Sequence, residues 1–97
     1  MKRSLRYVQR APTVDVKLAD GTLLSIPVVT GILKHLTHDR LPHLLQNPEV
    51  LRKYTCEALR VAAWPVLRLF PREWLLRNLP HAKVRPGRAE AIRFLLS

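Results

Sequence analysis

Basic side chains are the residues of this 97-residue sequence whose type and spacing point most clearly to a chemistry. Residues 48–97 carry ten Lys or Arg but only four Glu. Most of these cations are Arg, whose planar guanidinium donates paired hydrogen bonds to phosphate oxygens. A nucleic acid presents such oxygens along its whole backbone, so these residues indicate binding to DNA or RNA. The expected phosphate contacts are Arg52, Lys53, Arg60, Arg72, Arg77, Lys83, Arg85, Arg88 and Arg93.

The densest group of cations lies at 83–88, beside a Pro-Gly pair. Backbone amides at the start of a helix bind anions, so they could hold a phosphate together with Arg85 and Arg88. The segment is not a Walker loop, because the glycine spacing and the Lys-Ser/Thr ending of that motif are both missing. A plain basic loop is the alternative interpretation, as a solvated surface is for the cations in general.

A histidine cluster is the candidate for metal binding. His35, His38 and His43 lie close in sequence to Asp39, and two His with a carboxylate can bind a divalent metal. There is no HExxH pattern, and no second ligand group lies at a recognisable distance apart from the isolated Cys56 and His81. We therefore expect surface or helix-end roles for these side chains, with no metal, no cofactor and no catalytic residue.

Cys56 allows a functional and a structural interpretation. It lies between Arg52 and Arg60 on one i, i+4 row, which favours a thiolate if that row faces solvent. Free cysteines are more often buried, and we expect burial here. The large aromatic residues could likewise stack on unpaired bases, but their leucine neighbours favour places in the core. These residues are Trp64, Phe70 and Trp74.

Motifs that would choose between DNA and RNA are missing. The two helices expected near residues 72–79 and 87–96 are joined by about seven residues, too many for a helix-turn-helix. The aromatic strand motif of an RRM and the GxxG loop of a KH domain do not occur. The sequence therefore predicts phosphate contacts without indicating which nucleic acid is bound.

Composition limits the class of protein. A net charge of +10 and a pI near 11.1 exclude an ordinary neutral enzyme surface, while 47% hydrophobic residues suffice for a core. The longest uncharged run, 22–33, is shorter than a membrane span and contains Pro27 and Gly31. The single cysteine fits a reducing compartment, so we expect a cytoplasmic protein. We predict one compact domain at 13–97, preceded by a basic arm or edge strand at 1–12.

Two segments with alternating apolar residues predict a β-hairpin near the N-terminus. A two-residue loop would pair Val16 with Ser25 and misalign the apolar faces. A three-residue loop ending at Gly21 pairs Val14 with Ile26 and gives the glycine the left-handed conformation that a G1 bulge requires. We therefore predict the three-residue loop, and a third strand could form at 5–9.

Prolines divide the rest of the chain into short helices. The main helix is predicted from Asn47, a good N-cap, to about Trp64, where Pro65 follows. Its apolar row is Val50, Tyr54, Ala58 and Val61, flanked by Leu51 and Ala62. Shorter helices are expected at 32–40, 71–79 and 87–96, the last with Ile92, Leu95 and Leu96 turned inward. The class is α+β, a small hairpin followed by about four proline-punctuated helices.

These observations lead to two functional hypotheses. The first is a small non-enzymatic nucleic-acid-binding protein, either a regulator or an accessory factor, that grips phosphates with its arginine-rich C-terminal half. The second is a basic adaptor or assembly subunit that docks on an acidic partner protein. A homodimer is compatible with either, because so short a chain buries apolar surface incompletely. No membrane span is expected.

Overall fold

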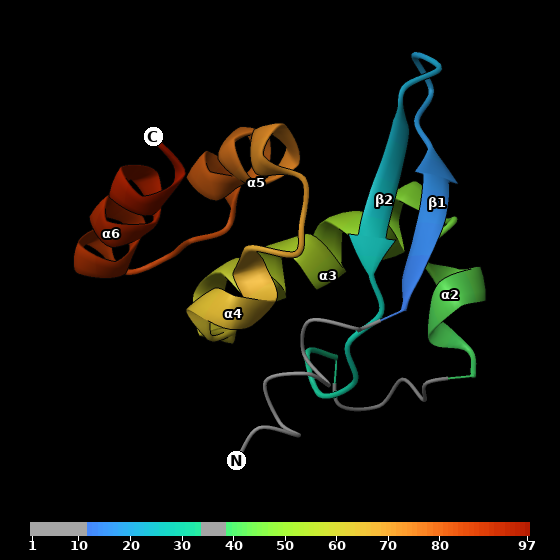
Figure 1. Cartoon of the computed structure of the whole chain (residues 1–97), viewed down its shortest axis with the longest axis horizontal. Helices are drawn as coiled ribbons and strands as arrows, with labels where there is room; N and C mark the ends of the chain where they lie inside the picture. The colour runs from blue at the N-terminus through green and yellow to red at the C-terminus, as the bar shows by residue number, and fades with distance from the viewer. Residues whose placement is uncertain (1–11, 34–38) are drawn as a thin grey trace.

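The structure is a computed structural model that describes residues 12–33 and 39–97 (Figure 1). In chain order its elements are β1 (Thr13–Lys17), β2 (Leu23–Pro27), α2 (Leu41–Leu44), α3 (Pro48–Val61), α4 (Trp64–Leu67), α5 (Arg72–Asn78), the 3₁₀ helix η1 (Leu79–His81) and α6 (Pro86–Leu96). In Figure 1 the hairpin and α2 lie toward one end of the long helix α3, while α4, α5 and α6 lie toward the other. The α+β class, with a hairpin ahead of short helices, is confirmed.

The hairpin has the predicted register. Val14 lies opposite Ile26, and the Leu18 amide donates to the Thr22 carbonyl over 2.8 Å, which closes a three-residue loop. Gly21 ends this loop with a φ of +90°, the left-handed conformation that glycine adopts without a steric penalty. The third strand considered at 5–9 lies outside the described residues.

α3 begins as the sequence predicts. The side chain of Asn47 accepts hydrogen bonds from the amides of Glu49 and Val50, at 2.9 and 3.4 Å. Pro48 fills the first helical position, where no amide donor is needed. Glu49 adds a negative charge near the positive end of the helix dipole.

Two prolines act differently from the prediction. α3 ends at Val61 rather than near Trp64, because the ring of Pro65 would clash with the Val61 carbonyl in a continuous helix. Pro65 instead lies in the first turn of α4, as Pro42 lies in the first turn of α2. Pro42 therefore lies at the start of a short helix, Leu41–Leu44, that was not predicted from the sequence.

The helix predicted at 32–40 is wrong in the part that the structure describes. Leu33 lies in a bend, and Asp39 and Arg40 form a turn ahead of α2. The rest of that prediction, at 34–38, lies outside the described residues. Within the described ranges, no helix combines the length and the apolar character that a bilayer span needs.

The buried stripe of α3 is rotated by about one residue from the predicted row. Val61 is 61% exposed, whereas Thr55 and Leu59 are fully buried. The reason is that α3 packs against the hairpin on one side and α5 on the other, so its buried face is set by two neighbours. Leu95 of α6 is also 48% exposed, contrary to its predicted inward position, whereas Ile92 and Leu96 are buried as expected.

Tyr54 joins the hairpin to α3. Its ring is fully buried, its hydroxyl donates to the Pro27 carbonyl over 2.5 Å, and the Val29 amide donates to the same hydroxyl over 2.9 Å. Burial raises the pKa of Tyr54 to about 12, while the hydrogen bond from Val29 opposes that rise. A single side chain thus satisfies two backbone groups where the chain leaves β2.

Two successive hydrogen bonds join α5 to α3. The indole nitrogen of Trp74 donates to the Thr55 hydroxyl over 2.8 Å, and that hydroxyl donates to the Leu51 carbonyl, also over 2.8 Å. Phe70 is buried beside Tyr54, as predicted, but Trp74 is only half-buried at the edge of the core. Trp64 is likewise half-buried against the core cluster.

Replacing Gly21 by Val should lower the free energy of unfolding by about 1–2 kcal/mol, because a branched side chain resists the left-handed backbone. Space is not the cause, since a Cβ at this position would meet no atom within 4 Å. Gly87→Val is the matched control, because Gly87 has equally open surroundings without a positive φ. Urea unfolding measures both, and equal stability of wild type and Gly21→Val would contradict the loop assignment.

Tyr54→Phe should destabilise the protein by about 1–3 kcal/mol at neutral pH, because two backbone groups lose their partner. The folded-state pKa of Tyr54 lies above its ordinary value of 10.0, at about 12, so the tyrosine stabilises fully below pH 10 and loses this contribution between pH 10 and 12. Urea unfolding across that range should show the difference between wild type and Tyr54→Phe shrinking. A difference that stays constant up to pH 12 would contradict the assignment.

Candidate functional site

α3 presents a shallow basic groove on its exposed side, with a volume of about 420 Å³. This α3 groove is lined by Leu33, Arg52, Lys53, Cys56, Glu57 and Arg60. Positions three and four apart lie on one face of a helix, which explains why five of these residues lie together. Three of the predicted phosphate contacts, Arg52, Lys53 and Arg60, are therefore brought into one place.

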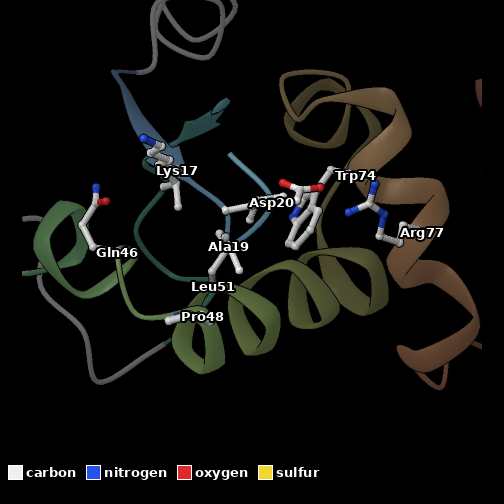
Figure 2. A pocket seen from close by; sticks show the side chains of 10 residues that line it. Lys17, Ala19, Asp20, Gln46, Pro48, Leu51, Trp74 and Arg77 are labelled. Carbon is white, nitrogen blue, oxygen red and sulfur yellow. The ribbon is translucent and has the colours of Figure 1, made fainter. Parts of the chain in front are cut away.

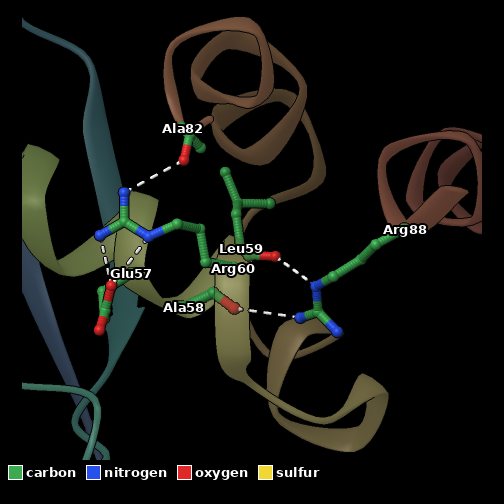
Figure 3. Close-up of polar contacts among 6 residues, drawn as sticks. All are labelled: Glu57, Ala58, Leu59, Arg60, Ala82 and Arg88. Carbon is green, nitrogen blue, oxygen red and sulfur yellow. Dashed lines mark hydrogen bonds and ion pairs between the residues drawn. The ribbon is translucent and has the colours of Figure 1, made fainter. Parts of the chain in front are cut away.

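Arg60 is held in a fixed position at one end of the α3 groove (Figure 3). It forms an ion pair with Glu57 through two guanidinium nitrogens and donates through Nη1 to the Ala82 carbonyl over 3.2 Å. The charge of Glu57 is thereby balanced. Among the described residues, Arg52 and Lys53 take part in no ion pair, so their charges remain available to an anion.

Lys83 does not line the α3 groove, but its backbone begins near one end of it. It follows Ala82, whose carbonyl Arg60 contacts. Lys83 is exposed and adopts a φ of 55°, a left-handed conformation uncommon for a residue with a side chain.

Arg88 has a structural role that the sequence did not indicate. Its Nε donates to the Leu59 carbonyl and its Nη2 to the Ala62 carbonyl, both over 2.6 Å, and Figure 3 shows it reaching α3 from α6. The last carbonyls of a helix have no partner within the helix, and a cation there complements the negative end of the dipole. The guanidinium predicted to bind phosphate is thus engaged as a cap of α3.

Arg72 caps α6 in the same way. Its Nε donates to the Leu96 carbonyl, and its Nη1 forms an ion pair with Glu73 at 2.8 Å. Two of the nine predicted contacts therefore spend their hydrogen-bonding capacity mainly on helix ends, which accounts for part of the arginine excess.

The remaining predicted contacts are exposed but lie outside the α3 groove. The guanidinium carbon of Arg77 lies 5.8 Å from the centre of the Trp74 ring, a cation–π arrangement. Arg85 precedes α6 as its N-cap, with no capping hydrogen bond from its side chain, and Arg93 lies in the last turn of that helix. Leu33 and Glu57 of the α3 groove were not predicted from the sequence. The Glu57–Arg60 spacing was the available signal for the second, and nothing local indicated the first.

Cys56 is buried, as expected. Burial raises the pKa of its thiol, and the positive charges of Arg60 and Arg52 oppose this rise only in part. The thiol is therefore protonated at neutral pH and a poor nucleophile.

Metal-binding geometry does not occur in the part of the chain that the structure describes, where no three His, Cys, Asp or Glu side chains form a suitable group. His43 is exposed in α2, while His35 and His38 lie outside the described residues.

Comparison with protein-family models, with curated proteins and with solved structures finds no match for this chain.

Arg88→Gln should lower the free energy of unfolding by about 1–3 kcal/mol, because it leaves part-buried carbonyls of α3 without donors. Arg85→Gln removes the same charge from an exposed site and should change stability by less than about 0.5 kcal/mol. Urea unfolding of the two variants provides the comparison. Equal stability of the two proteins would show that Arg88 does not cap α3.

Proposed function

We propose that this protein is a small, basic, non-enzymatic nucleic-acid-binding protein, a regulator or accessory factor, that holds phosphates in the α3 groove. The observation that carries the proposal is the convergence of Arg52, Lys53 and Arg60 on one exposed face of α3. Lys83 lies beside that face. Arg77, Arg85 and Arg93 add positive charge elsewhere on the surface, which attracts a polyanion over a longer range.

The groove suits phosphates better than base edges. Arg52 can donate a pair of hydrogen bonds to one phosphate, while Lys53 acts as a compact charge on the next. Each neutralised phosphate releases counterions, so binding should depend steeply on salt. The groove has no amide side chain of the kind that reads adenine, although Arg52 and Lys53 can donate to guanine as well as to phosphate.

The non-enzymatic part of the proposal rests on the groups that the groove offers. Glu57 is paired with Arg60, and the thiol of Cys56 is protonated, so neither is poised as a base or nucleophile. We propose the cytoplasm as the compartment, which is consistent with a lone buried cysteine.

A second candidate function is docking on an acidic protein through α6. Phe94 is 78% exposed and Leu95 is 48% exposed, next to the cation of Arg93. Large apolar side chains on a surface are typical of protein contacts, and a neighbouring cation would steer an acidic partner. Docking of this kind, or pairing of two copies, should persist at salt concentrations that abolish phosphate binding.

The double variant Arg52→Gln/Lys53→Gln should bind single-stranded or double-stranded DNA or RNA roughly tenfold more weakly near 100 mM salt. Its plot of log affinity against log salt should be shallower by about two. Fluorescence anisotropy with labelled oligonucleotides, over about 50–300 mM salt, measures both quantities.

The matched control is Arg40→Gln/Arg68→Gln, which removes the same charge from two exposed residues that do not line the α3 groove. It should weaken binding much less. Equal weakening by the two double variants would mean that the charge acts generally, and the α3 groove would lose its assigned role.

A further inference from the structure

A second cavity lies between the turn of the hairpin, the start of α3 and α5 (Figure 2). Its volume is about 340 Å³, and its apolar wall includes Leu18, Leu51 and the indole of Trp74. Lys17 from β1 and Arg77 from α5 also line it. A cavity of this size is near the lower limit for small-molecule sites, so it suits one small ligand and excludes a helix or a duplex.

The indole that lines this cavity is held in place. Its nitrogen is bonded to the Thr55 hydroxyl, which is itself bonded to the Leu51 carbonyl within α3. The ring of Trp74 therefore offers a planar apolar surface whose orientation is fixed before a ligand arrives. A fixed aromatic surface loses little conformational entropy on stacking with another ring.

The charged groups of the cavity come from opposite walls. Arg77 lies above the Trp74 ring, with its guanidinium carbon 5.8 Å from the ring centre. Asp20, on the hairpin turn, accepts a hydrogen bond from the Thr22 amide at 2.9 Å. That bond, aided by the charge of Arg77, lowers the pKa of Asp20, so its carboxylate is ionised at neutral pH. Asp20 and Arg77 form no ion pair in the described structure, so both keep hydrogen-bonding capacity.

We propose that this cavity binds one nucleotide unit, with its base against Trp74 and Leu51 and its phosphate held by Arg77. Asp20 then accepts a hydrogen bond from a ring N–H or amino group of the base. The three requirements of this ligand class are a flat apolar wall, a cation and a hydrogen-bond acceptor, and Trp74, Arg77 and Asp20 supply them. An anion without a ring would leave the indole unused.

This site goes beyond the α3 groove and does not depend on it. Arg60 lies nine residues after Leu51, which is two and a half helical turns, so the groove and the cavity occupy opposite sides of α3. The nucleotide unit has two sources, a free mononucleotide or an unpaired residue of a nucleic-acid strand. The same recognition chemistry serves both.

The test is a titration of the full chain in a Trp64→Phe background, which leaves Trp74 as its single tryptophan. The probes are AMP, GMP, CMP and UMP, with inorganic phosphate and the four nucleosides as incomplete ligands. We expect at least one mononucleotide to quench the Trp74 fluorescence saturably. It should do so at concentrations at least about tenfold below those needed with phosphate or the nucleoside. Calorimetry on the unmodified chain repeats the measurement if Trp64→Phe does not fold.

Arg77→Gln should weaken mononucleotide binding about tenfold, the loss expected for one charge-assisted hydrogen bond. Arg68→Gln, which removes an exposed arginine that does not line the cavity, should leave it unchanged. A short single-stranded oligonucleotide serves as the other source. If the oligonucleotide binds more tightly than the mononucleotide and loses the same factor in affinity with Arg77→Gln, the natural ligand is an unpaired residue of a strand. If the mononucleotide binds more tightly, the natural ligand is the free mononucleotide.

Two results would overturn the inference. One is the absence of saturable quenching or heat with any mononucleotide at millimolar concentrations, and the other is equal affinity of wild type and Arg77→Gln. Failure of the α3 groove gives a different pattern, because Arg52→Gln/Lys53→Gln would then weaken oligonucleotide binding no more than its control Arg40→Gln/Arg68→Gln, whatever the mononucleotides do. Each site can therefore fail while the other stands.

Discussion

Unpaired backbone groups at the ends of short elements are the constraint on which the rest of this structure depends. A four-residue helix has almost no internal hydrogen bonds, and the described part of the chain contains two, α2 and α4. The Tyr54 hydroxyl bonds the backbone groups where the chain leaves β2, and the Arg88 guanidinium bonds the carbonyls at the end of α3. In both cases the side chain is distant in sequence from the backbone groups that it bonds. α3 is therefore the common support, joined to the hairpin by a phenol, to α5 by an indole and to α6 by a guanidinium.

This constraint divides the arginines into two groups. Arg88 donates only to carbonyls at the end of α3. Arg72 divides its donors between the Leu96 carbonyl and Glu73, and Arg60 divides its donors between Ala82 and Glu57. Arg52 remains exposed on the same helix that these bonds hold in place. A guanidinium is suited to both tasks, because its fork can contact two carbonyls or two phosphate oxygens with the same geometry. Total charge is consequently a poor measure of the charge that a ligand meets.

α3 also separates the two sites that the proposals concern. One side carries the α3 groove, where cations lie with little aromatic surface, and the opposite side contributes Leu51 to the cavity beside Trp74. Backbone phosphates fit the first environment, and a ring with one phosphate fits the second.

The sequence by itself determined the features that short-range geometry controls. The register of the hairpin follows from Gly21 and from the alternation of apolar and polar residues along the strand that contains Val14. The start of α3 follows from Asn47. Tertiary structure decided which faces were buried and what the cations do. Val61 is exposed because two neighbours rotate the buried face of α3, and Arg88 caps a helix 29 residues away from it in sequence. Caps and turns act within a few residues, whereas burial and long-range hydrogen bonds depend on elements that meet only after folding.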